Sequence, residues 1–202
     1  MPELKYASTI KSLQNKNSWI SFDLVYAGIL DPTPVTQSYA FVRCGCPTPP
    51  GLTANTTVIE VPVSKVMIQD TVTVPKITLI GQGSAIEFVE DSTFITTRSV
   101  RTALFAGSVT DVQFDYTKVN GALPDVIVTD PGMLMSMNGT TMIPNPTWYN
   151  QSFTQTLESR RLMETDASEK TPLGRAELIK LYGLLFGISE SANSVFTAIE
   201  QK

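Results

Sequence analysis

Apolar residues occupy nearly every second position between residues 58 and 89, and this alternation predicts a run of short β-strands. Pro62 and Pro75 cannot donate a hydrogen bond to a neighbouring strand, so each is expected at a strand boundary. The segment Gly81-Gln82-Gly83 favours a hairpin turn. The strands predicted here cover residues 59–63, 65–68, 72–74, 77–80 and 85–89. We therefore expect this stretch to be the scaffold of the fold.

Similar alternation continues on both sides of this stretch. Further strands are predicted at residues 20–26, 35–43, 93–97, 100–106, 109–116, 125–129 and 133–137. Strands that follow one another every 8–12 residues or so, with no helical pattern between them, are typical of an antiparallel sandwich or barrel. The sequence therefore predicts a mainly β fold, with an antiparallel β-sandwich or barrel at its centre.

The spacing of apolar residues changes to a helical period at the two ends of the chain. Helices are predicted at residues 2–16 and 150–163, after the Thr171-Pro172 pair, and after Ser189 or Ser191. The chain is thus expected to consist of a β-rich core domain, residues 1–148, and a helical C-terminal segment, residues 149–202. This segment would either pack on the core or be exchanged with a neighbouring subunit.

Composition restricts the chemistry that the chain can perform. It contains no histidine, which excludes Ser-His and Cys-His nucleophile pairs and histidine-containing zinc sites. Cys44 and Cys46 are too few for a closed structural zinc site and too close together for an unstrained disulfide. The formal net charge of −4 gives no overall attraction for nucleic acid, which would need a local patch. We expect no catalysis, no metal and no cofactor.

Targeting signals are the next feature to consider. The amino terminus lacks the basic and apolar regions of a signal peptide, and no apolar run reaches the roughly 18 residues of a membrane-spanning helix. We therefore expect a cytoplasmic protein, with any membrane contact limited to its surface.

Four features are candidate interaction surfaces: a proline-rich loop beside the two cysteines, a methionine cluster, an arginine pair and the apolar face of the last helix. Methionines suit adaptable contacts or an irregular core gap. Arginines near aromatic residues suit single-stranded nucleic acid, and they equally suit a solvated helix face. The residues of these surfaces are Cys44, Cys46, Pro47, Pro49, Pro50, Met133, Met135, Met137, Arg160, Arg161, Val195, Phe196 and Ile199.

Carboxylates offer a second kind of chemistry. Glu87, Glu90 and Asp91 flank a predicted turn, and Asp111 and Asp115 share one face of a predicted strand. Paired acids can perform glycosidase-type hydrolysis, although solvated or edge-protecting charges explain the same pattern. A carboxylate-based hydrolase without histidine is therefore one alternative function. A carbohydrate- or peptide-binding β-sandwich module is the other.

Asp31, Val61-Pro62, Gln69-Asp70, Gly81 and the strand at 85–89 follow one another in an order that can be compared with known proteins. In this order, residues 20–97 resemble the thirty-kilodalton superfamily of plant-virus movement proteins. The resemblance implies a β-rich core with helices at its ends, self-association, binding of single-stranded nucleic acid and action at membranes. This chain departs from the family in being acidic, which argues against the nucleic-acid binding that the resemblance implies.

Viral matrix and coat proteins share the same gross features. The predicted function is therefore that of a non-catalytic, self-associating structural protein, of the viral movement, matrix or coat-like kind. Its expected partners are further copies of itself, and a viral nucleoprotein or host proteins. Its expected location is the host-cell cytoplasm or the virion.

Overall fold

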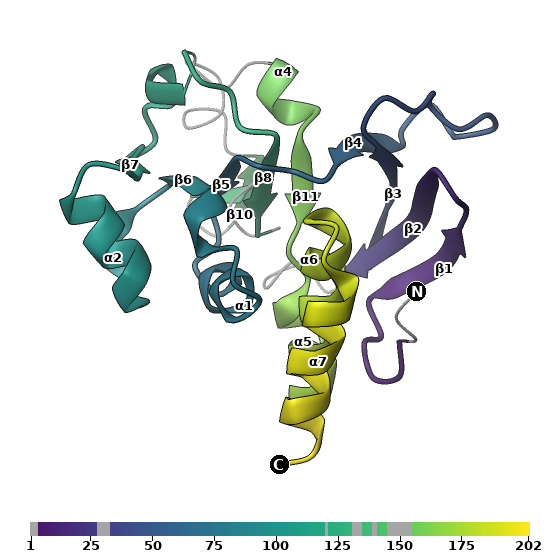
Figure 1. Ribbon diagram of the computed structural model, residues 1–202. Coiled ribbons are helices and arrows are strands. Elements are labelled where there is room, and N and C mark those ends of the chain that lie inside the picture. The colour runs from purple at the N-terminus through teal and green to yellow at the C-terminus, as the bar shows by residue number, and fades with distance from the viewer. Residues whose placement is uncertain (1–3, 28–32, 120, 131–134, 139–140, 145–154) are drawn as a thin grey trace.

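The computed structural model describes residues 4–27, 33–119, 121–130, 135–138, 141–144 and 155–202. Within these residues the chain forms a mixed α/β fold: a four-stranded sheet, a five-stranded sheet, a two-stranded hairpin and several helices (Figure 1). The predicted mainly β sandwich or barrel is therefore wrong. The five-stranded sheet is parallel throughout, and parallel strands require crossover connections that a sandwich of hairpins does not contain.

The four-stranded sheet contains three of the strands predicted from the sequence, those at 20–26, 35–43 and 59–63. In the order β1-β2-β3-β4 its strands are Ile10–Asn15, Trp19–Tyr26, Val35–Arg43 and Thr57–Val61. The first three pair antiparallel, and β4 pairs parallel to β3. Every second residue in the latter half of β2 is buried, so this sheet covers the core with one face. The short helix predicted at 2–16 is wrong, because residues 10–15 pair with β2 instead.

The five-stranded sheet has the order β11-β8-β5-β6-β7. Its strands are β5 Val66–Ile68, β6 Ile86–Val89, β7 Thr110–Asp111, β8 Val126–Thr129 and β11 Arg161–Met163. Every residue of β5, β8 and β11 is buried. Short, continuously buried runs are typical of a parallel sheet whose two faces are both covered.

Helices connect these parallel strands where the sequence suggested more strands. Helix α1, Thr73–Leu79, lies between β5 and β6, and α2, Arg98–Phe105, lies between β6 and β7. The strands predicted at 72–74, 77–80 and 100–106 are therefore wrong. Pro75 lies in the first turn of α1, where its missing N–H has no intrahelical partner to lose.

Four short 3-10 helices are η1 Gly83–Ala85, η2 Ser92–Phe94, η3 Tyr116–Val119 and η5 Asp166–Ser168. The strand predicted at 93–97 is wrong, because η2 takes its place. Of the strand predicted at 109–116, only β7 remains. The expected hairpin at Gly81-Gln82-Gly83 is wrong as well, because the strand that follows it, β6, runs parallel to β5.

Between β8 and β11 lie the hairpin strands β9, Met135–Asn138, and β10, Thr141–Pro144, and the short helix α4, Gln155–Glu158. The helix predicted at 150–163 is confirmed over α4 and wrong over residues 161–163, which form β11, while residues 150–154 lie outside the described residues.

Three helices complete the chain: α5 Pro172–Glu177, α6 Ile179–Leu185 and α7 Ser189–Glu200. The side-chain oxygen of Thr171 accepts the Gly174 N–H at 3.0 Å, which confirms the predicted N-cap with proline in the first turn. The helix predicted after Ser189 is confirmed as α7.

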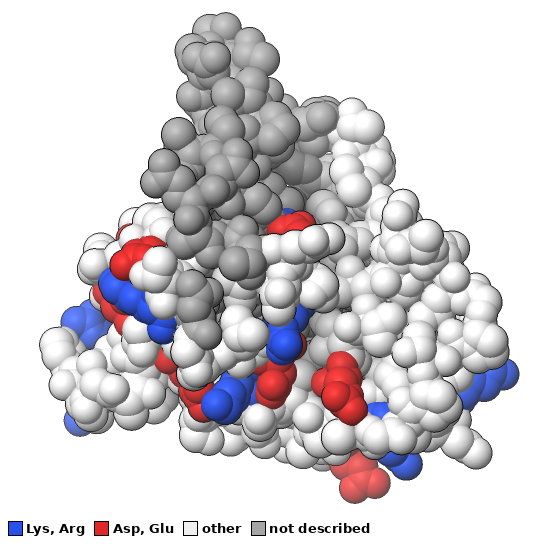
Figure 2. Space-filling model, turned by 90° about the horizontal axis from the view of Figure 1, so that it is seen from above, with Lys and Arg blue, Asp and Glu red and all other residues white. Residues whose placement is uncertain are grey.

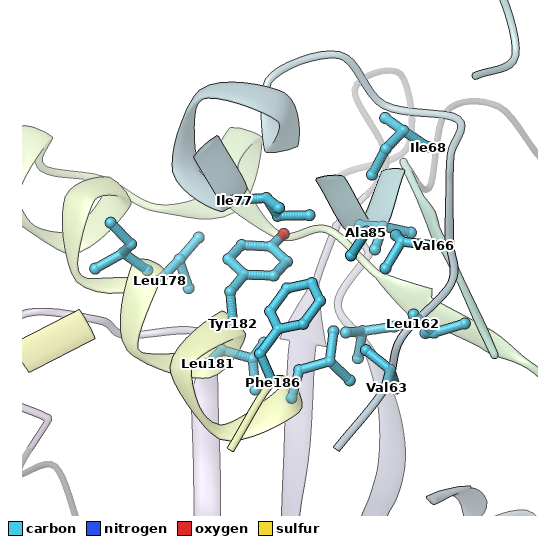
Figure 3. Packing of buried hydrophobic residues seen from close by; sticks show 14 of the residues in the cluster. Val63, Val66, Ile68, Ile77, Ala85, Leu162, Leu178, Leu181, Tyr182 and Phe186 are labelled. Carbon is cyan, nitrogen blue, oxygen red and sulfur yellow. The ribbon is translucent and has the colours of Figure 1, made fainter. Parts of the chain in front are cut away.

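Buried residues of both sheets and of the C-terminal helices form one large hydrophobic cluster. Figure 3 shows Tyr182 and Phe186 projecting from α6 toward Ile77 of α1 and Leu162 of β11. A smaller cluster, which includes Met67, covers the opposite face of the parallel sheet. The division at residues 148 and 149 stays a prediction, although β11 and α6 share the large cluster with the amino-terminal strands.

Candidate ligand site at the carboxyl edge of the parallel sheet

The strand order creates a switch point beside β5. The chain builds β5, β6 and β7 in one direction and then returns to place β8 and β11 on the other side of β5 (Figure 1). Connections from the neighbours β5 and β8 therefore leave the sheet in opposite directions. In open α/β sheets such a point leaves a crevice outside the carboxyl ends of the strands, where ligands bind.

Acidic and amide side chains are concentrated at this carboxyl edge. Each of the five parallel strands ends at, or is followed within two residues by, a carboxylate. The residues at these strand ends are Gln69 and Asp70 after β5, Glu90 and Asp91 after β6, Asp111 at the end of β7, Asp130 after β8, and Glu164 after β11. The parallel sheet thus brings together acids that are up to about a hundred residues apart in the sequence.

Asp70, at the switch point, carries the most informative electrostatics. Burial, together with the charges of Glu164 and Asp130, raises the pKa of its carboxyl group to about 6. Among the described residues, its one hydrogen-bond donor is the N–H of Val72, at 3.1 Å, which lowers the pKa together with the charge of Lys76. Asp70 is therefore a half-buried acid with unused acceptor capacity.

Glu90 is held by a hydrogen-bonded triad next to this position. Its carboxylate accepts the Tyr116 hydroxyl at 2.8 Å and the Gln69 side-chain amide at 3.1 Å. The same amide group donates to the Tyr116 hydroxyl oxygen at 2.9 Å. Burial raises the pKa of Glu90, and these donors oppose the rise. The triad fixes the orientation of Gln69, which directly precedes Asp70 in the sequence.

Glu164, in contrast, is fully engaged by its own structure. It is buried and accepts hydrogen bonds from the Tyr182 hydroxyl, from Thr73 at 3.1 Å and from the Asp166 N–H at 2.9 Å. Lys76 lies 3.3 Å from it and 2.7 Å from Asp166. This cluster anchors α1 and α6 to β11, so its role is structural.

The edge can therefore act as an acceptor-rich binding surface. The half-buried Asp70 and Gln69 can provide a carboxylate and an amide carbonyl, while the buried Glu90 and Tyr116 hold Gln69 in place. No group of three or more His, Cys, Asp or Glu side chains is placed to hold a metal ion, as far as the described residues show.

The proline-rich loop lies elsewhere, beyond β3. Cys44 is exposed and Cys46 half-buried, and both are free thiols. A hydrogen bond with Glu60 raises the pKa of the Cys44 thiol, which makes the reactive thiolate less available. Pro47 and Pro50 are exposed, while Pro49 is buried.

The arginine pair divides between two environments. Arg161 is buried, 4% exposed, and lies 2.7 Å from Glu158. Arg160 donates to the Pro124 carbonyl at 2.8 Å. On the face seen from above, basic and acidic residues are interspersed rather than segregated (Figure 2).

The remaining candidate surfaces are the apolar face of the last helix and the methionine cluster. Phe196 is buried against the ring of Tyr6, with 6.1 Å between ring centroids, while Val195 and Ile199 are half-buried. Met133 lies outside the described residues, and Met135 and Met137 belong to β9. A role for these residues as an interaction surface stays a prediction.

The predicted acid pairs do not form a catalytic pair either. Asp111 accepts a hydrogen bond from Ser92, Asp115 accepts one from Thr117, and Glu87 lies 3.8 Å from Lys65. The residues missed as a site were Gln69, Asp70, Tyr116 and Asp130. The available signal was a polar residue directly after each short apolar run, which is where a parallel sheet places its ligand-binding side chains.

Comparison with known proteins gives a likeness of fold. No family model and no curated protein matches the chain. A similar solved structure is the crystal structure of a periplasmic binding protein from Veillonella parvula DSM 2008, with a TM-score of 0.50 and 12% sequence identity. The match covers 95% of this chain and 53% of that one, so the chain spans about half the length of this neighbour. At this identity the likeness shows the fold alone.

This likeness corrects the functional prediction. The resemblance to plant-virus movement proteins is wrong, because the region that carried it holds parallel strands and α1 rather than a β-rich core. The viral movement, matrix or coat-like function is wrong with it. Of the alternatives, a binding module agrees better with the neighbour, although its scaffold is α/β and not a sandwich. No helix in the described part of the chain is long and apolar enough to cross a membrane.

Proposed function

We propose that this chain is a ligand-binding lobe that takes a small polar ligand at the carboxyl edge of its parallel sheet. The observation that carries the proposal is the half-buried Asp70 at the switch point between β5 and β8, with one described hydrogen-bond donor and a pKa raised to about 6. Perturbed acids of this kind gather at functional sites, because binding rather than folding uses them. The fold shared with a periplasmic binding protein supports the same proposal.

The ligand would present hydrogen-bond donors to this edge. Asp70 accepts from it, Glu90 stays fixed by Tyr116, and Gln69, whose amide N–H groups bond to Glu90 and Tyr116, can accept through its carbonyl oxygen. The lobe holds its ligand without chemical conversion. A ligand that offers a positive charge or several hydroxyl or amine donors would favour the ionised form of Asp70 and lower its pKa on binding.

A thermal-shift screen tests this proposal. Purified protein is heated with a library of amines, amino acids, sugars and nucleosides, and hits are titrated by calorimetry. We expect at least one hit that loses about tenfold or more in affinity in Asp70→Asn, the loss typical of removing a charged hydrogen-bond partner. Glu87→Gln is the matched control, since Glu87 has only a long surface contact with Lys65, and it should bind as wild type.

Two results would contradict the proposal. One is a set of hits whose affinity is unchanged in Asp70→Asn. The other is equal weakening by Asp70→Asn and Glu87→Gln, which would indicate unspecific attraction to an acidic protein. Self-association and cytoplasmic location stay predictions, and sedimentation at several protein concentrations would test the first.

A further inference from the structure

A cavity lies at the opposite end of helix α6 from the carboxyl edge. It encloses about 600 Å³ between the turn that joins β1 to β2, the end of β3, and the turn that joins α6 to α7. Helix α6 links the two ends: its Tyr182 hydroxyl contacts Glu164 at the carboxyl edge, and its Leu185 carbonyl accepts the Val63 N–H, at 3.1 Å, just before β5. Ligand-binding pockets for small molecules commonly measure 300–1,000 Å³ or so, and this volume falls in that range.

The interior of this cavity is apolar and partly aromatic. Its lining includes the buried Phe41, the half-buried Trp19 and Ile20, and Leu184 from α6. Strand pairing places Ile20 opposite Phe41, so the apolar surface is part of a rigid sheet. Such a surface suits the flat body of an aromatic compound, because pockets for such ligands are lined mainly by apolar side chains.

The rim of the cavity is positively charged. Lys16 and Arg43 line it, and the Arg43 N–H donates to the Ser18 carbonyl at 2.8 Å, which holds the β1–β2 turn against the end of β3. Neither cation forms an ion pair within the described part of the chain, whereas Lys5, Lys65 and Lys76 all do. Glu190 is the one acid among the lining residues.

We propose that this cavity is a second binding site, for a small aromatic carboxylic acid. The aromatic body would lie on Ile20 and Leu184, and the carboxylate would lie between Lys16 and Arg43. Arginine and lysine form their strongest hydrogen bonds with carboxylates, and an apolar floor next to two cations matches an amphiphilic anion better than a sugar or an amine. The site is independent of the proposed ligand site at the carboxyl edge.

The test uses naphthoate as the probe and naphthalenemethanol as its uncharged counterpart, with binding to the full chain followed by calorimetry and by amide NMR. Naphthoate is expected to bind about tenfold or more tightly than the alcohol, and to shift the amide signals of Trp19, Arg43 and Ser189. Added salt should weaken naphthoate binding and leave the alcohol unaffected.

Three variants make the assignment specific. Lys16→Gln and Arg43→Gln change exposed side chains, so the fold should survive, and each should weaken naphthoate binding several-fold. Lys202→Gln removes an exposed lysine beyond the other end of α7 and should leave binding unchanged. Asp70→Asn should also leave it unchanged, which separates this site from the carboxyl edge.

The proposal is overturned if naphthoate does not bind at millimolar concentration, or if naphthoate and its alcohol bind equally. It is also overturned if Lys16→Gln and Arg43→Gln both bind as wild type, or if the shifted amides lie at residues 69–72 and 90–92.

Discussion

Buried carboxylates occur in two regions of this protein under opposite conditions. On α5, Glu177 is fully buried and accepts the N–H groups of Lys5, Tyr6 and Ala7, at 2.6–2.9 Å, and it also contacts Lys180 at 2.8 Å. At the carboxyl edge, Asp70 accepts one described N–H. The donors to Glu177 outweigh the effect of burial and hold the pKa of Glu177 below its ordinary value. Burial raises the pKa of Asp70 to about 6.

The difference shows what each region is for. A carboxylate whose lone pairs are filled by backbone donors stabilises the fold, and here Glu177 fixes the amino-terminal segment to the C-terminal helices. Glu169 does the same for the next two residues, Ser8 and Thr9. A carboxylate that folding leaves short of donors destabilises the free protein, and such a cost is expected where a ligand will supply the missing donors.

The largest expected effect on the free energy of unfolding is at Glu177, whose lone pairs are filled by donors. Glu177→Gln replaces an acceptor-only group with one that also carries an N–H₂ donor among three N–H groups and an ammonium group. The free energy of unfolding should fall by about 3–5 kcal/mol, because the substitution also removes the negative charge that the buried Lys180 contacts. Urea denaturation at pH 7 measures this. A loss under about 1 kcal/mol would mean that the amino-terminal segment is not held through Glu177.

A smaller loss is expected at the Glu164 cluster. Tyr182→Phe removes a hydroxyl that is bonded to Glu164 and lies 3.3 Å from Thr73, while the ring stays in the core. Because Thr73, Lys76 and the Asp166 N–H still contact Glu164, unfolding should become easier by about 1–2 kcal/mol. The same denaturation experiment applies. An unchanged stability would show that Glu164 resembles Asp70, as an acid that the fold does not supply with stabilising donors.

At the carboxyl edge, a substitution should raise the free energy of unfolding instead of lowering it. Asp70→Asn removes a charge that burial disfavours, so at pH 7 the variant should be more stable than the wild type by about 1–2 kcal/mol, after allowance for solvent screening of a half-buried group. Denaturation of both proteins at pH 7 measures this gain. A destabilised variant would show that Asp70 is structural.

The stability gain of Asp70→Asn should depend on pH, because it comes from the raised pKa of Asp70. The folded state holds the Asp70 proton more tightly than the unfolded chain, so this stabilising contribution is lost as the pH rises from 3.8 to about 6. For Glu177 the folded pKa is lowered, and its contribution is lost as the pH falls below its ordinary value of 4.5. The stability gain of Asp70→Asn should therefore grow between pH 4 and pH 6, roughly, and a flat difference would contradict the raised pKa.

The smallest effect is expected at the surface. Glu87→Gln should change the free energy of unfolding by less than about 0.5 kcal/mol, because an exposed ion pair contributes little. It therefore serves as the baseline for the other three substitutions in the same denaturation series. A loss comparable with that of Tyr182→Phe would show that any loss of negative charge destabilises this protein.

Local pattern predicted the elements whose burial is one-sided. Alternation along β2 and the amphipathic α7 could be read from the sequence, because each buries one face more than the other. In α1, Val72 and Val74 suggested a strand, yet the buried Thr73, Ile77 and Ile80 already had the spacing of a helix. A continuous apolar run such as β5 does not indicate which strand will pair with it.

The candidate site could not be predicted for that reason. Gln69 and Asp70 acquire their role only when β8 returns to the other side of β5, which is a matter of strand order rather than of local sequence. The missing histidine correctly removed several kinds of catalysis from consideration, but it carries no information on where a ligand would bind.

The central claim is that the carboxyl edge at the switch point binds the ligand, while the Glu177 region only holds the fold. Amide NMR with the compound that raises the melting temperature most tests it directly. The signals of residues 69–72, 90–92 and 129–130 are expected to shift, with those of residues 5–9 and 174–180 unchanged. Shifts confined to residues 5–9 and 174–180, or spread evenly over the chain, would contradict the claim.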